Sequence, residues 1–239
     1  DVPKVLSWTG NLICIGYKTE YVLFDISDEK RRRQDLFPTT TASRSIDPCV
    51  TLIDNDKFFG VVKDEHLLTI PTTSDESSSN LLKLDSTASI LDPKSNKSFT
   101  ITWSEPPILV VWDEPFLLGL LTDSIEVRVL DTSGLDKDNL IQVIPEVQKA
   151  RFLFSGRSKQ QGLIFAASTS HLWCIESIDI ATQRQNLLQD KKWFLALQLT
   201  TMSDESEEDK QLMTHEIQTL YAYNLFINKQ FREAMLEFS

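Results

Sequence analysis

The sequence predicts a mainly β domain followed by helices, namely the C-terminal blades of a β-propeller and then a helical-repeat α-solenoid. Two observations lead to this prediction. Short apolar runs separated by polar turns recur up to residue 178, and two matching stretches lie 38 residues apart near the C-terminus. We therefore assign residues 1–178 to a partial β-propeller and residues 179–239 to the first helical pairs of an α-solenoid.

The strands of the β domain are predicted from runs of four to seven apolar residues rich in Val, Ile, Phe and Leu. They fall into four sets: Val5–Trp8, Leu12–Tyr17 and Tyr21–Ile26; Cys49–Ile53, Phe58–Val62 and His66–Ile70; Phe99–Trp103, Ile108–Trp112, Phe116–Leu121 and Ile125–Leu130; Arg151–Phe154, Leu163–Ala167 and His171–Ile175. The paired middle strands of the four sets begin near residues 11, 57, 115 and 162, at intervals of 46, 58 and 47.

Intervals of this size are typical of propeller blades, which run about 40–50 residues. A β-sandwich also gives short strands with regular turns, and it stays open as the alternative architecture. The longest interval contains the polar insertion Thr72–Ser79, which we expect to be a solvated loop whose serines could be phosphorylated. Because four blades are few for a closed ring and the sequence starts inside a strand pattern, we expect the early blades to be missing.

The pattern changes to helical spacing near Ile178. We expect helices over 180–189, 192–202, 208–228 and from 230 onward, with Asp179 as the cap of the first. The acidic run Ser203–Asp209 adjoins the start of the third helix, where negative charge is favourable by about 0.3–1 kcal/mol. That placement explains the run without a ligand, although its serines are also candidates for phosphorylation.

The repeat at a spacing of 38 residues aligns Leu187–Leu197 with Leu225–Met235. Each copy has two apolar residues, a polar turn with Lys, an aromatic residue, and an Ala three positions later. A small Ala allows two helices to approach closely. Periods in the thirties with this pattern are typical of stacked helical pairs, which display surface for binding.

Composition excludes several classes of function. The 35 acidic and 24 basic residues give a net charge of −11, which disfavours nucleic acids and anionic membranes as partners. The basic run Lys30–Arg33 is interpreted as a solvated hairpin loop, with an acidic contact as the weaker alternative. No apolar run is long enough for a transmembrane helix, and we recognise no secretory leader. Cys14, Cys49 and Cys174 are expected to be buried thiols in a reducing compartment.

No catalytic, cofactor-binding or metal-binding residue is expected in this chain, and no cofactor or small-molecule substrate. His66 and His171 lie in strand patterns, and His215 lacks a second histidine four residues away. No Gly-rich phosphate loop occurs among the seven glycines, and the acidic pair Asp113-Glu114 lies in a turn. Apolar surroundings are expected to make Cys14 and Cys174 unreactive.

Five aromatic residues are expected to serve packing. Trp103, Trp112 and Trp173 are expected to pack between blades, and Tyr221 and Tyr223 to line the inner face of the third helix. No partner-binding residue can be named from the sequence.

Two groups of residues carry a resemblance to a known family. Asp1–Lys4, Trp8, Asn11–Lys18 and Tyr21 resemble the late part of a citron homology domain. Five short stretches are similar to the vacuolar protein sorting subunit thirty-nine (Vam-six) family: Ala181–Gln183, Leu187–Lys191, Ala196–Leu199, Leu220–Ala222 and Asn224–Phe226. The Ser74–Ser79 insertion and the Lys30–Arg33 run depart from the family pattern.

The resemblance implies a non-catalytic subunit of the HOPS membrane-tethering complex. It further implies a citron homology propeller that contacts a late-endosomal Rab GTPase or the membrane surface, and a solenoid that joins the other tether subunits. The location it implies is cytoplasmic, peripheral on late endosomes and lysosomes or vacuoles, with membrane association through partners and a role in fusion and autophagy.

Alternative functions stay open at this point. The resemblance also allows a guanine-nucleotide-exchange factor for small GTPases, and the related early-endosomal CORVET subunit has the same architecture. A coat-like protein of the clathrin kind also couples a propeller to a solenoid. A propeller enzyme would need a catalytic group that we do not find in the sequence.

Overall fold

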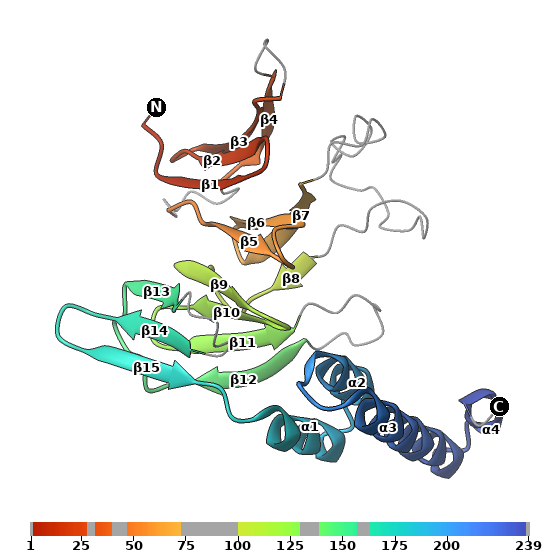
Figure 1. Ribbon diagram of the computed structural model, residues 1–239. Coiled ribbons are helices and arrows are strands. Elements are labelled where there is room, and N and C mark those ends of the chain that lie inside the picture. Colours follow the sequence, from red (N-terminus) through yellow and green to blue (C-terminus); the bar gives the residue numbers. More distant parts are fainter. Residues whose placement is uncertain are drawn as a thin grey trace. The chain divides into compact units, whose positions relative to one another are not determined.

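The computed structural model describes residues 2–27, 32–39, 47–72, 100–129, 139–156 and 163–237 (Figure 1). Residue contacts divide the chain into two compact units, Asp1–Ile175 and Glu176–Ser239. The first unit is built from strands and the second from helices. The boundary that the sequence predicts, at residue 178, lies three residues beyond this division, and the identity of the two parts stays a prediction.

The first unit consists of four antiparallel sheets that follow one another along the chain (Figure 1). The first sheet contains β1 (Val5–Thr9), β2 (Leu12–Gly16), β3 (Glu20–Asp25) and β4 (Arg32–Pro38). The second contains β5 (Val50–Ile53), β6 (Phe58–Lys63), β7 (His66–Pro71) and β8 (Thr100–Thr102). The third contains β9 (Leu109–Asp113), β10 (Phe116–Leu120), β11 (Ile125–Val129) and β12 (Leu140–Ile144); the fourth contains β13 (Phe152–Ser155), β14 (Leu163–Ala167) and β15 (Leu172–Glu176).

Within each sheet, strands that are consecutive in sequence lie side by side. Short turns set this meander. Gly10, with φ of 52°, lies in the turn between β1 and β2, and three residues of left-handed backbone, Asp54 to Asp56, form the turn between β5 and β6. Gly and Asx residues adopt positive φ at low cost, so these turns are encoded locally.

Three apolar cores lie between successive sheets. The first joins side chains of the first sheet, such as Cys14, to side chains of the second, such as Phe59. The second core joins the second sheet to the third, and the third core joins the third sheet to the fourth. In β10 the neighbouring residues Leu117 and Leu118 belong to different cores, because alternate side chains of a strand point to opposite faces.

One buried polar side chain links the first two sheets. The hydroxyl of Tyr21, on β3, donates to the carbonyl of Val62 at 2.6 Å and accepts from the amide of Cys49 at 3.0 Å. Burial raises the pKa of this phenol, so the hydroxyl stays protonated and can make both bonds.

The first strands of successive sheets also contact one another: β1 contacts β5, β5 contacts β9, and β9 contacts β13. Four-stranded meanders that stack face to face, with their first strands adjacent, have the topology of propeller blades. The prediction of a mainly β part followed by helices is confirmed. The described residues contain four sheets and four helices, and a closed ring and a longer solenoid stay predictions.

One predicted strand is grouped with the wrong sheet, two strands are not predicted, and one predicted loop is partly a strand. The segment Phe99–Trp103 was assigned to the third set, but β8 pairs with β7 and completes the second sheet. The strands β4 and β12 were not expected. In β4, polar residues mask the strand pattern, and the predicted loop Lys30–Arg33 is a strand from Arg32 onward. Lys30 and Arg31, like the insertion from residue 73 on, lie outside the described residues.

The second unit contains α1 (Ile180–Gln189), α2 (Trp193–Met202), α3 (Glu207–Ile227) and α4 (Phe231–Glu237). Each helix contacts the next along the chain. The predicted helices agree with these bounds to within a few residues, because their start and stop signals are local. Asp179 caps α1 as expected, accepting the amide of Thr182 at 2.9 Å.

Candidate interaction surface

The described part of the chain holds no arrangement that suggests a reaction centre. It contains no group of three His, Cys, Asp or Glu residues that could bind a metal ion. His66 and His171 bond to nearby hydroxyls, those of Thr102 and Ser170. His215, on α3, lines an open groove together with Thr201 and Lys210. No helix among these residues has the length and apolar character to cross a membrane.

The three cysteines differ in accessibility. Cys14 and Cys49 are buried, and burial raises the pKa of both thiols to about 12. These thiols therefore stay protonated at neutral pH. The expectation that Cys174 is buried is wrong, because its side chain is exposed on β15.

The predicted packing of the tryptophans between sheets is confirmed. Trp103 is buried in the core between the second and third sheets, Trp112 packs against the same core, and Trp173 packs against the core between the third and fourth sheets. Of the two tyrosines, Tyr221 contacts the rings of Trp193 and Phe194. The prediction for Tyr223 is wrong, because its side chain is 59% exposed.

A buried charged cluster that the sequence analysis missed lies beside Trp103. Arg128 binds the carboxylate of Glu126 through Nη2 at 2.7 Å and Nε at 2.8 Å, and its guanidinium lies 5.5 Å from the centre of the Trp103 ring. Arg128 also donates to the amide oxygen of Asn139 at 2.9 Å. Since these charges are paired and hydrogen-bonded, the cluster serves structure, fixing the third sheet against Trp103.

The 38-residue repeat is also a repeat in backbone geometry. Lys191 and Lys229, which are 38 residues apart, both have left-handed backbone, with φ of 59° and 64°. The backbone hydrogen bonds of the two turns are also the same. In the first copy the amide of 190 donates to the carbonyl of 186, that of 191 to 188 and that of 192 to 187. In the second copy, 38 residues later, the amide of 228 donates to the carbonyl of 224, that of 229 to 226 and that of 230 to 225. Ala196 and Ala234 are both fully buried. Two copies of one helix–turn–helix unit therefore follow each other in this unit.

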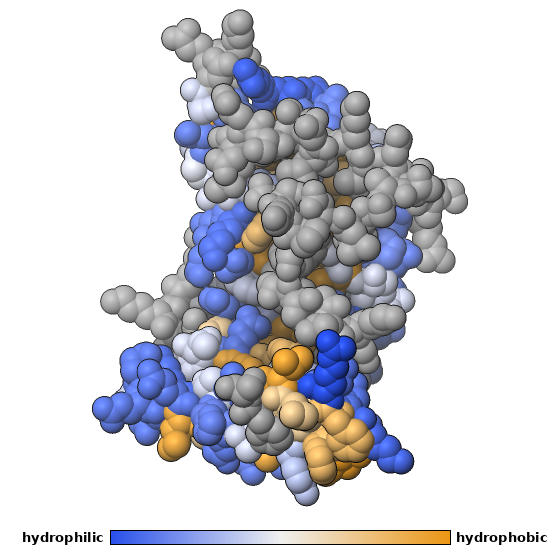
Figure 2. Space-filling view, turned by 90° about the vertical axis from the view of Figure 1, so that its right-hand side faces the viewer, coloured by the Kyte–Doolittle hydropathy of each residue, from blue (hydrophilic) through white to orange (hydrophobic). Residues whose placement is uncertain are grey.

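The two copies differ in what covers them. In the first copy, α3 packs against α2, and Leu195 and Leu199 are buried. In the second copy, apolar side chains at the end of α3 and on α4 are exposed; we call them the terminal helix surface, which comprises Leu220, Tyr223, Phe226, Ile227, Phe231 and Met235. Figure 2 shows apolar side chains gathered on the helical unit. The rings of Phe226 and Phe231 are in edge contact, 5.2 Å apart.

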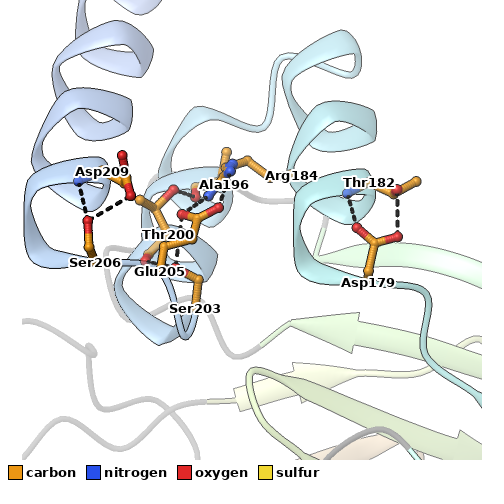
Figure 3. A network of polar contacts seen from close by, with 9 residues as sticks. All are labelled: Asp179, Thr182, Arg184, Ala196, Thr200, Ser203, Glu205, Ser206 and Asp209. Atoms are coloured by element: carbon orange, nitrogen blue, oxygen red, sulfur yellow. Dashed lines mark hydrogen bonds and ion pairs between the residues drawn. The ribbon is translucent and has the colours of Figure 1, made fainter.

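A polar junction links α1 to the segment between α2 and α3 (Figure 3). Both terminal nitrogens of Arg184, on α1, donate to the carboxylate of Glu205 at 2.9 and 2.8 Å. The hydroxyl of Ser203 also donates to Glu205, and these bonds hold the pKa of Glu205 below its usual range. At the start of α3, Ser206 accepts the amide of Asp209 at 3.2 Å. The acidic run thus adjoins the start of α3, as expected. The cap at Ser206 and the bond of Glu205 to Arg184 were not predicted from the sequence.

Apolar surface is exposed on the two terminal sheets as well. On the fourth sheet Phe152 and Phe154 are exposed, and on the first sheet Leu6 and Trp8 are exposed. The opposite face of each of these sheets is buried in an inter-sheet core. Among the residues that the structure describes, apolar side chains are therefore exposed on three surfaces, two on sheets and one on helices.

Comparison with known sequences finds relatives that are much longer than this chain. The vacuolar protein sorting-associated protein 39 homolog of Drosophila melanogaster is 44% identical over 240 residues, which is 100% of this chain and 26% of the relative. The Vam6/Vps39-like protein of Mus musculus is 33% identical over 241 residues, and this alignment covers 100% of this chain and 23% of the relative. The chain thus spans about a quarter of these relatives, and no family model matches it.

The similarity to solved structures is weaker. A solved structure of Kluyveromyces lactis Hsv2 has a TM-score of 0.49 and 10% identity, and it covers 76% of this chain and 51% of that protein. This level of similarity adds no argument to the strand order and inter-sheet contacts described above. The name of the Drosophila relative refers to vacuolar protein sorting.

Proposed function

This chain belongs to the Vam6/Vps39 family of vacuolar sorting proteins, and we propose that it is part of a non-catalytic subunit of the HOPS membrane-tethering complex. The observation that carries the proposal is the 44% identity over the whole chain to a vacuolar protein sorting-associated protein 39 homolog. In this role the protein holds a late-endosomal Rab GTPase and the other tether subunits together at late endosomes, lysosomes or vacuoles.

The architecture supports a role in assembly. Inter-sheet cores and the repeated helical pair give stable scaffolds, and the apolar surfaces on both units supply area for further contacts. A tether gains residence time from several weak sites on one molecule, because the second contact forms at a high effective concentration. A scaffold of this kind requires no reaction centre.

The first part of the proposal concerns the β unit. The exposed faces of the first and fourth sheets each resemble one half of an inter-sheet core, with Leu6 and Trp8 on one and Phe152 and Phe154 on the other. In a ring of blades both faces are covered by neighbouring blades. The four sheets therefore form part of a larger citron homology propeller whose early blades come from the rest of the protein.

The second part concerns the helical unit. In the first copy of the repeat, the following helix, α3, packs on α2. The equivalent surface of the second copy includes Phe231 and Met235, which are 51% and 73% exposed. A further helical pair, packed in the same way, covers this surface and continues the α-solenoid toward the other tether subunits.

Purification of the full-length protein with Rab GTPases tests the function. GTP-loaded late-endosomal Rab is expected to bind, GDP-loaded Rab to bind more weakly, and the other HOPS subunits to co-purify in near-equal amounts. Binding of neither the Rab nor the subunits would refute the tethering role, and co-purification of CORVET-specific subunits would move the protein to the early-endosomal tether. Accelerated release of a fluorescent nucleotide from the Rab would instead indicate an exchange factor.

Substitution of Met235 tests the solenoid in the full-length protein. Met235→Asp places a charge where the next helical pair is expected, and burial of a Met side chain is worth about 1.5–3 kcal/mol. Amide hydrogen exchange in α4 is expected to become faster. Leu212→Asp is the matched control, because Leu212 is equally exposed, at 70%, but lies outside the terminal helix surface. Equal effects of the two substitutions would contradict the proposal.

A further inference from the structure

The basic residues of the helical unit gather at two turns. Residues 176–239 contain six basic and eleven acidic residues. Four of the six basic residues lie in or directly after the turns between α1 and α2 and between α3 and α4: Lys191, Lys192, Lys229 and Arg232. The other two, Arg184 and Lys210, form ion pairs within the unit. The unit is therefore acidic as a whole but basic at these turns.

The two turns lie at the same end of the helical unit. The helices α1, α2 and α3 are joined by short connections and each contacts the next, so α1 and α3 run in the same direction. The rings of Trp193 and Phe194, at the start of α2, lie 6.2 and 5.5 Å from that of Tyr221, in the last third of α3. We call the four basic residues at this end the basic end. The acidic run Ser203–Asp209 lies at the opposite end.

Lys191 and Lys229 occupy positions that favour a different residue. Both have left-handed backbone, with φ of 59° and 64°. In each turn the amides of this lysine and of the next residue donate to the carbonyls three and five positions earlier, which is the Schellman motif. The left-handed position of that motif is usually Gly, because a Cβ atom is strained there. Backbone preference therefore does not explain a lysine in both copies.

The start of α2 also departs from local preference. Lys192 occupies its N-cap without a side-chain cap hydrogen bond, and the first turn of α2 contains no acidic residue. Ser, Thr, Asp and Asn are preferred at an N-cap, and positive charge is unfavourable there. At the opposite end, Asp179 and Ser206 cap α1 and α3 with side-chain oxygens. Local rules are thus obeyed at one end of the unit and broken at the basic end, which is typical of a functional surface.

Three basic side chains at this end are available for a partner. Lys191, Lys229 and Arg232 are exposed, and none of them forms an ion pair with another residue that the structure describes. Asp190 and Glu233 lie at the same turns, so four basic and two acidic residues give the basic end a formal charge of +2. Exposed and unpaired charges of one sign attract a surface of the opposite sign.

We propose that the basic end binds an acidic segment of a partner protein, with carboxylates paired to Lys191, Lys229 and Arg232. A short segment fits better than an anionic membrane, because the chain has a net charge of −11 and a broad membrane surface would meet this whole field, whereas a segment meets the basic end alone. Phe194, which is 45% exposed at the start of α2, adds an apolar contact beside the lysines. This inference does not depend on the tethering function.

Fluorescence anisotropy of the full-length protein with a labelled oligoglutamate peptide, about eight residues long, tests the proposal at about 50 mM salt. The peptide is expected to bind, and an oligoglutamine peptide of the same length is not. Combined substitution Lys191→Gln, Lys229→Gln and Arg232→Gln is expected to weaken binding at least about tenfold. The matched control changes three exposed basic residues of the β unit, Lys4→Gln, Lys18→Gln and Arg151→Gln, and alters the net charge equally. This control is expected to bind as the native protein does.

A charge-preserving variant separates binding from folding. Lys191→Arg with Lys229→Arg keeps the positive charge and is expected to keep the affinity, while amide hydrogen exchange of α1 to α3 reports whether each variant is folded.

Three outcomes would overturn the proposal. The first is absence of oligoglutamate binding by the native protein, and the second is equal affinity of the two triple variants. The third is binding of phosphatidylserine vesicles without binding of the peptide, which would assign the basic end to a membrane surface. Failure of Rab or HOPS subunits to bind would leave the peptide result unaffected, so the two proposals fail separately.

Discussion

Gly119→Ala provides a sharp test of the packing between the second and third sheets. Gly119 lies on β10, and a Cβ atom added there would lie 2.5 Å from the ring of Trp103, with two further ring atoms within 2.8 Å. Trp103 is 2% exposed and packed in the second core, so its ring has little room to move. Overpacking of this kind costs about 1–3 kcal/mol.

Local hydrogen exchange measures this cost directly in the full-length protein. A loss of about 1–3 kcal/mol corresponds to roughly 5- to 150-fold faster exchange of the protected amides in β9 to β11. Gly156→Ala is the matched control, because a Cβ there meets its nearest neighbours at ordinary distances of 3.4–3.6 Å. That control is expected to leave exchange unchanged or slightly slower.

The cause of the effect can be verified by a second substitution. Trp103→Leu alone creates a cavity and destabilises the core, but it also removes the ring that Gly119→Ala would meet. The double variant is therefore expected to be more stable than the sum of the two single effects predicts. Additive effects, or a Gly119→Ala protein as stable as Gly156→Ala, would refute the packing argument.

Two further predictions concern single side chains. Glu205→Gln is expected to lower the free energy of unfolding of the helical unit at pH 7, measured by denaturant unfolding followed by circular dichroism. Bonding to Arg184 lowers the pKa of Glu205 in the folded state, so the stabilisation by this carboxylate is complete above the unfolded pKa of about 4.3 and is lost as the pH falls through the lower folded pKa. The difference in unfolding free energy between the two proteins should therefore shrink at pH 3. A difference independent of pH would contradict the ion pair. Cys174 in the 239-residue chain is expected to react with iodoacetamide at pH 8, whereas Cys14 and Cys49, with pKa values of about 12, react only after unfolding; equal labelling of all three would contradict the burial described here.

The helical part of the fold could be read almost fully from the sequence. Helix caps and turns depend on residues three or four positions apart, so Asp179 and the repeated turn at Lys191 and Lys229 are visible as local patterns. The same holds for strands with strong apolar runs, such as β6 and β10. The strand β4, which is rich in polar residues, gives no comparable signal, whereas β12 has four apolar residues of five and was not predicted in spite of that pattern.

The interaction surfaces depend on information that is not local. Cys174 and Phe154 lie in apolar runs that look like buried strands, but their exposure follows from the position of the fourth sheet at the end of the stack. The pairing of β8 with β7 spans a long insertion, so sequence spacing grouped that strand with the wrong sheet. The ion pair between Arg184 and Glu205 likewise joins residues 21 positions apart.

The sequence alone determined the order of a β part and a helical part, the repeated helical pair and the family, because periodicity, caps and residue identity are properties of the chain itself. Tertiary structure alone decided which sheet each strand joins, which apolar faces stay exposed, and that the fourth sheet ends at β15. The physical reason is that pairing and burial arise from contacts between distant segments, and a residue's own neighbours in sequence do not specify them.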